Sequence, residues 1–181
     1  VDDAGGASVG FDAILASRLP DFTESDAVRI AADTFAVGAA SATNLGSERD
    51  QTFLLSGPAG EGVAIMKVSN SAEDPATLDM EALAVLHARR ADPTLPVALP
   101  RIAPGADPER IGAAAYRART AGATEGETHL VRLYEVLPGS GRSDPLALSD
   151  AAIADWGEMT ARLARALRSF AHPSAHRTML W

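Results

Sequence analysis

Residues 45–55 read LGSERDQTFLL, residues 57–62 read GPAGEG and residues 63–68 read VAIMKV. The first and third of these runs are rich in the apolar and β-branched residues that favour strands, and the glycine- and proline-rich run between them is typical of a hairpin loop. This segment therefore predicts two neighbouring antiparallel strands, at about residues 51–56 and 63–69.

Lys67, near the end of the second strand, is the only lysine among the 16 lysines and arginines of the chain. Because side chains alternate along a strand, Val63, Ile65 and Lys67 share one face. An ammonium among apolar neighbours favours the wall of a cleft, whereas the alternative is a lysine on a solvated edge strand.

A helix is predicted on each side of this hairpin. The first is expected at about residues 24–37, where Thr23 and Asp26 have the spacing of a capping box, and Gly38 is expected to end it. A second helix, at about 75–90, carries Glu81 at the edge of its apolar stripe. A half-buried carboxylate needs a cation, and we expect Lys67 to provide it.

Further strands are expected at about residues 39–43, 97–103, 113–119 and 129–137, with a polar loop at 120–127. A final helix, capped by Ser149, is expected to end at His172 and Pro173. Its apolar residues recur at spacings of three and four, which favours a packed core stripe. The stripe comprises Ile153, Trp156, Thr160, Leu163, Leu167 and Phe170. Together these elements predict an α+β fold: an antiparallel sheet of about five strands with a packed helix, an N-terminal helix and a C-terminal helix.

The composition limits the classes of function. The chain has 181 residues, of which 46% are apolar, and this is enough for one core. A net charge of −8 argues against nucleic acids and anionic membranes as partners. The absence of cysteine excludes disulfides and thiolate metal sites. No run is long enough to span a membrane and no signal peptide is evident, so a cytoplasmic protein is expected.

The ends of the chain predict a segment of a longer protein. The chain begins with Val1 and ends with the bulky apolar Trp181. We expect a flexible segment at residues 1–20, a folded lobe at 21–138, and a linker and helix at 139–181.

The sequence resembles the aminoglycoside phosphotransferase-like family, which includes choline, homoserine and hydroxylysine kinases. It is most similar to the hydroxylysine-kinase-like branch, some members of which are fused to aminotransferases. The resemblance covers about residues 24–181. The residues that carry it are 47–55 (SERDQTFLL), 65–70 (IMKVSN), Glu81, 137–139 (LPG), 172–173 (HP) and 177–181 (RTMLW). It implies that residues 21–138 form a protein-kinase-like small lobe that binds ATP, and that residues 139–181 lead to a second lobe outside this chain.

The resemblance also implies roles on the phosphate side of an ATP site. Lys67 would contact the α- and β-phosphates, and Glu81 would orient Lys67. The turn that contains Ser47, Glu48 and Arg49 would lie over the phosphates.

On the adenine side, the resemblance assigns Ile65 to an apolar slot. Backbone groups of Glu135 and Leu137 would hold the edge of the base, because Pro138 has no N–H to offer.

The catalytic half of such an enzyme is missing from the sequence. After Leu137 there is no His-x-Asp-x-x-x-x-Asn run and no aspartate-rich stretch for Mg²⁺. We therefore expect no phosphoryl transfer by this chain alone; Mg²⁺ and the acceptor, a hydroxylated amine or amino acid, would be bound in the full-length protein. Loss of the second lobe would expose apolar surface on the final helix and allow a non-native dimer.

Other interpretations remain open. The alternative is a non-catalytic, kinase-like interaction or regulatory module of a multidomain enzyme, and a third is an unrelated α+β binding domain. His172 and His176 have the spacing of metal ligands on a helix, but Pro173 lies between them. Ser47 lacks the Gly-x-Ser-x-Gly setting of a nucleophile.

Overall fold

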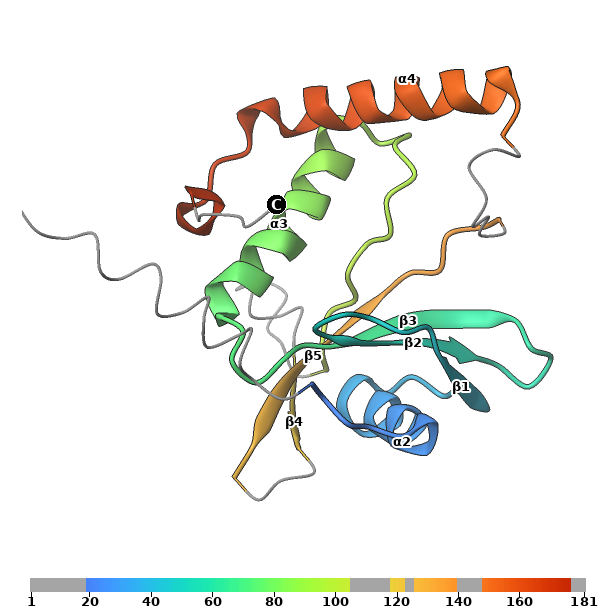
Figure 1. Cartoon of the computed structure of the whole chain (residues 1–181), viewed down its shortest axis with the longest axis vertical. Helices are drawn as coiled ribbons and strands as arrows, with labels where there is room; N and C mark the ends of the chain where they lie inside the picture. Colours follow the sequence, from blue (N-terminus) through green and yellow to red (C-terminus); the bar gives the residue numbers. More distant parts are fainter. Residues whose placement is uncertain (1–18, 105–117, 123–125, 140–147, 177–181) are drawn as a thin grey trace, which may run out of the picture.

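The computed structural model describes residues 19–104, 118–122, 126–139 and 148–176. They form an antiparallel five-stranded sheet in the order β1-β2-β3-β5-β4, together with three α-helices (Figure 1). The strands are β1 (Ser41–Asn44), β2 (Gln51–Ser56), β3 (Gly62–Val68), β4 (Ala118–Ala121) and β5 (Thr128–Tyr134). The helices are α2 (Glu24–Phe35), α3 (Pro75–Ala91) and α4 (Asp150–Ala166), followed by the 3₁₀ turns η4 (Leu167–Ser169) and η5 (Pro173–His176). The predicted α+β class and antiparallel sheet are confirmed.

The main core lies between α2 and one face of the sheet. Alternation along β3 buries Ala64, Met66 and Val68, whereas the residues between them are only half-buried. Ile30 and Phe35 of α2 belong to the same apolar cluster. Burying a side chain of this size contributes about 1.5–3 kcal/mol, so this face holds the sheet and α2 together. The predicted division of β3 into two faces is confirmed, and it leaves the Lys67 face free of the α2 core.

The N-terminus of α2 has the predicted capping box. The Thr23 hydroxyl accepts a hydrogen bond from the Asp26 N–H, and the Asp26 carboxylate accepts one from the Thr23 N–H. Hydrogen bonds from the Thr23 hydroxyl and from Arg29 lower the pKa of Asp26 to about 2. The predicted end of the helix was wrong: Ala36, in the left-handed conformation with φ 53°, closes the helix before Gly38. Its N–H bonds to carbonyls of the last turn, which stops the helix without a glycine.

The helices α3 and α4 lie on the other side of the sheet from α2 and pack mainly on each other. In Figure 1, α3 rises from the side of the sheet opposite α2, and α4 lies across the far end of α3. Ala88, Leu95 and Ala166 form a small apolar cluster at the junction of the two helices. The Arg162 guanidinium of α4 donates to both carboxylate oxygens of Asp92, at 2.9 and 3.0 Å, which fixes α4 to the C-cap of α3.

The apolar stripe of α4 is not a core, contrary to the prediction. Trp156 is 64% exposed, Ile153 52% and Leu163 36%, and Ala166 is the one buried residue of the helix. The reason is that α4 packs on α3 mainly near its own C-terminal end. This leaves Ile153, Trp156 and Leu163 exposed, whereas Leu167 packs against the cluster at the α3–α4 junction. The helix also ends earlier than predicted, at Ala166.

Of the other predicted strands, β1 and β5 form with shifted bounds and the one predicted at 97–103 is not a strand. Residues 97–103 contain a single bridge, between Pro100 and Tyr134, because prolines at 96, 100 and 104 cannot donate to a ladder. The strand predicted at 113–119 lies largely outside the described residues, and β4 continues to Ala121, inside the predicted loop. None of the described helices is both long and apolar enough to cross a membrane.

Candidate functional site

Two cations stand side by side on the sheet face that does not pack against α2. Lys67 of β3 and Arg132 of β5 are direct cross-strand partners, so their side chains project from the same face. The Lys67 side chain is 37% exposed and can reach water, whereas that of Arg132 is 1% exposed. Like charges this close require carboxylates, and the structure supplies two of them.

The Glu81 carboxylate of α3 is bound to Arg132. Arg132 Nη1 donates to Glu81 Oε2 at 2.7 Å, a short charge-assisted bond. The predicted pairing of Glu81 with Lys67 is therefore replaced by pairing with the neighbouring cation. The physical reason is burial: a guanidinium without access to water needs a carboxylate more than a half-exposed ammonium does.

Asp50 is the carboxylate beside Lys67. Its Oδ2 lies 3.8 Å from Lys67 Nζ, and its Oδ1 accepts the N–H of Asn70 at 3.3 Å. Asp50 directly precedes β2, the strand that pairs with β3 on the side away from Arg132. The two cations thus have one carboxylate each, one from the start of β2 and one from α3.

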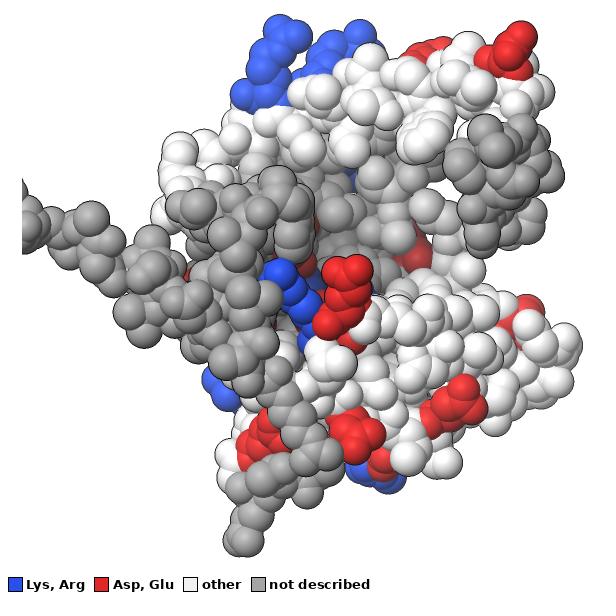
Figure 2. All heavy atoms as spheres, in the orientation of Figure 1, with Lys and Arg blue, Asp and Glu red and all other residues white. Residues whose placement is uncertain are grey.

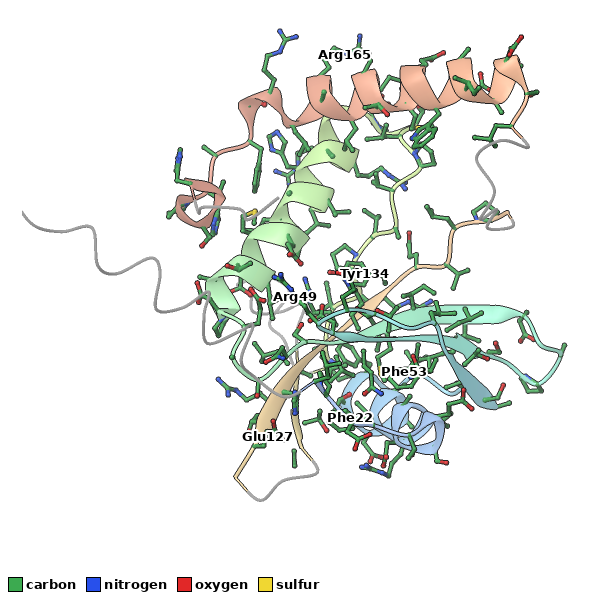
Figure 3. All side chains as sticks on the ribbon, viewed as in Figure 1. Phe22, Arg49, Phe53, Glu127, Tyr134 and Arg165 are labelled. Atoms are coloured by element: carbon green, nitrogen blue, oxygen red, sulfur yellow. The ribbon has the colours of Figure 1, made fainter. Side chains whose placement is uncertain are left out.

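Tyr134 completes the cluster. The Arg132 guanidinium carbon lies 5.8 Å from the centre of the Tyr134 ring. Ile65 of β3 is the cross-strand partner of Tyr134. Burial raises the pKa of the Tyr134 hydroxyl; the charges of Glu81 and Asp50 act in the same direction, and that of Arg132 opposes them. In Figure 3, Tyr134 lies towards the base of α3, whereas Phe22 and Phe53 lie on the α2 side.

The turn between β1 and β2 carries three of the predicted residues. Gly46 has φ +73°, and its N–H bonds to the Asn44 side chain, which turns the chain sharply after β1. Ser47 and Glu48 are exposed, and Arg49 is half-buried. Figure 3 shows Arg49 near the base of α3, on the same side of the sheet as Tyr134.

The segment after β5 is held along residues 99–101. The Glu135 N–H donates to the Leu99 carbonyl at 3.0 Å, and the Leu99 N–H approaches the Glu135 carboxylate at 3.4 Å. The N–H of Glu135 is therefore engaged within the protein, which leaves its carbonyl as the group suited to a ligand. Leu137 is 42% exposed.

The sequence-predicted residues thus divide into three groups. Ile65 and Lys67 share the face described above, and Glu81 reaches that face through Arg132. Ser47, Glu48 and Arg49 belong to the turn that leads into Asp50, whereas Glu135 and Leu137 follow β5.

Sequence reasoning did not assign roles to Asp50, Arg132 or Tyr134. Arg132 had a usable signal, because it is a charged residue between Val131 and Leu133 in an apolar strand. The position of Lys67 among apolar residues of a strand is the same kind of signal.

Two further features of the described chain bear on the location of a site. A shallow depression of about 380 Å³ beside α2 and β1 contains none of these residues. No group of three or more histidine or carboxylate side chains is placed to hold a metal within the described ranges. Figure 2 shows basic and acidic side chains side by side at the centre of the face, where the surface is hollowed between its upper and lower parts.

No protein-family model matches the chain, and no curated protein matches it.

Proposed function

We propose that this chain is the ATP-binding, kinase-like lobe of a phosphotransferase that acts on a hydroxyl group of a small amine or amino acid. The observation that carries the proposal is the position of Lys67. It lies on the third strand of an antiparallel sheet, on the face away from α2, and the next helix sends a carboxylate to the same face. In kinases a lysine on the third strand contacts the α- and β-phosphates of ATP.

The geometry of the face suits a nucleotide. The Lys67 side chain is 37% exposed, so phosphate oxygens can reach it. The turn at residues 46–49 lies one strand away and would cover the phosphates, as the resemblance to the aminoglycoside phosphotransferase-like family implies. Ile65 is two residues from Lys67 on the same face, towards the segment that contains Glu135 and Leu137, so an adenine ring would lie at that end.

The proposal concerns binding and not turnover by this chain. The acceptor hydroxyl and Mg²⁺ would be bound by the catalytic motifs of such an enzyme, which do not occur after Leu137 in this sequence. Mg²⁺ would enter with the phosphates of the nucleotide and neutralise part of their charge.

Titration of the chain with Mg·ATP tests the proposal. We expect saturable binding by calorimetry, and we expect Lys67→Met to weaken it at least tenfold because the phosphate contact is lost. Arg29→Met, which removes a cation from the far side of α2, is the matched control. A folded wild-type chain that binds neither ATP nor ADP at millimolar concentration would refute the proposal and favour the non-catalytic module.

A further inference from the structure

We infer that Asp50 positions Lys67 for the nucleotide, and that Glu81 instead anchors α3 to the sheet through Arg132. The inference rests on the proposed function for the role of Lys67. It reassigns the helix carboxylate that the resemblance placed beside the lysine.

Asp50 is held on a fixed stretch of backbone. The neighbouring Gln51 pairs with Val68 in the β2–β3 ladder, and its side chain makes two hydrogen bonds to the backbone of Phe22, at 2.8 and 2.9 Å. The Asp50 carboxylate is then oriented by the N–H of Asn70, a residue that is 3% exposed. One oxygen is thereby aimed at Lys67, whose flexible stem gains a preferred direction.

Glu81 is committed elsewhere. Its partner Arg132 has a side chain that is 1% exposed, and the Nε of that guanidinium has no hydrogen-bond partner in the described part of the chain. Moving Glu81 to Lys67 would leave a buried cation without its carboxylate, and this loss exceeds the gain at a half-exposed lysine. The Glu81–Arg132 bond is therefore a structural link between α3 and β5.

This arrangement couples Lys67 to the turn over the phosphates. Asp50 is the last residue of that turn before β2, so movement of the turn is transmitted to the lysine through one carboxylate.

The lysine itself provides the first test, because Lys67 is the only lysine in the chain. Labelling with ¹³C-lysine gives one ε-methylene signal in an NMR spectrum, without any nucleotide. We expect Asp50→Asn to shift this signal, and Glu81→Gln to shift it less while lowering the melting temperature. A larger shift for Glu81→Gln than for Asp50→Asn would overturn the inference.

Mg·ATP affinity provides the second test. We expect Asp50→Asn to weaken binding about two- to fivefold, as befits a partly exposed ion pair, and Asp50→Glu to restore most of it. Lys67→Met should cost less affinity in the Asp50→Asn background than in the wild type, because the two residues act together. Asp33→Asn, which removes an exposed charge from α2, is the control.

A positioning role and a purely electrostatic role of Asp50 predict opposite changes in nucleotide affinity for Asp50→Asn. If Asp50 acted only as a negative charge near the phosphates, Asp50→Asn would tighten binding of the anionic nucleotide. Equal or tighter binding by Asp50→Asn therefore contradicts the inference. If the wild type binds no nucleotide, the proposed function and any nucleotide role of Asp50 fail together, while the lysine signal still decides whether Asp50 is the partner of Lys67.

Discussion

Replacing Glu81 with alanine should destabilise the fold far more than removing its partner. Glu81→Ala leaves the Arg132 guanidinium buried at 1% exposure without the carboxylate 2.7 Å away. An uncompensated buried charge is among the most unfavourable changes a single substitution can make. Arg132→Met, in contrast, removes the charge and fills a similar volume with an apolar chain.

The magnitude follows from the burial of the two partners. Breaking a fully buried ion pair costs about 3–5 kcal/mol. Because the Glu81 side chain is 40% exposed, water can replace part of its contact, and we expect a loss of about 2–3 kcal/mol. Arg132→Met leaves a carboxylate that water can solvate, so its loss should be about 1 kcal/mol or less.

Urea unfolding followed by circular dichroism measures these free energies. The double variant Glu81→Ala/Arg132→Met isolates the pair from any other contact of Glu81, and we expect it to be more stable than Glu81→Ala alone. Asp33→Ala is the matched control, because its carboxylate lies 3.9 Å from Arg29 in an exposed pair on α2. That variant should lose less than about 0.5 kcal/mol.

The reasoning is refuted if Arg132→Met costs as much as Glu81→Ala. Such a result would mean that the guanidinium is valuable for its packing or its contact with Tyr134, and not as a charge that must be neutralised. A loss below about 0.5 kcal/mol for Glu81→Ala would show that Arg132 finds another partner.

Three further predictions concern other parts of the fold. Hydrogen bonds from Thr23 and Arg29 lower the pKa of Asp26 from its ordinary value of 3.8 to about 2, so its contribution to stability is present above about pH 4 and lost as the pH falls towards 2; the difference in urea midpoint between wild type and Asp26→Asn should shrink over that range, and a constant difference would contradict it. Arg162→Leu removes both hydrogen bonds to Asp92, so amide hydrogen exchange should accelerate in α4 and stay unchanged in the sheet; equal acceleration in both would show that α4 is not held separately. Trp156→Ser should change the free energy of unfolding by less than about 0.5 kcal/mol, because the indole is 64% exposed, and a loss above 1 kcal/mol would indicate a buried role.

Local patterns predicted much of the secondary structure. The β2 range was predicted correctly from residue types alone, and β3 differs by one residue at each end. The caps at Thr23 and Ser149 were also predicted, because a capping side chain bonds to a backbone N–H within three residues. Such contacts depend on the immediate sequence, so the sequence contains the information needed to predict them.

Partner choice in the candidate site could not be predicted in this way. Lys67 and Glu81 were identified as a cation and a carboxylate that needed partners, and both have them. Which cation Glu81 binds depends on strand order, because β5 lies next to β3 and places Arg132 beside Lys67 across 65 residues of chain. The difference in burial between the two cations then decides the pairing, and burial is a property of the packed molecule.

The chain's own residue pattern was enough to establish the hairpin, the two faces of β3 and the starts of the helices, since these follow from periodicity and short-range bonds. The assembled fold placed Asp50 beside Lys67, paired Glu81 with Arg132 and left Ile153, Trp156 and Leu163 of α4 exposed. Those outcomes arise from contacts between segments distant in sequence, where solvent access sets the energy of each charge and each apolar group.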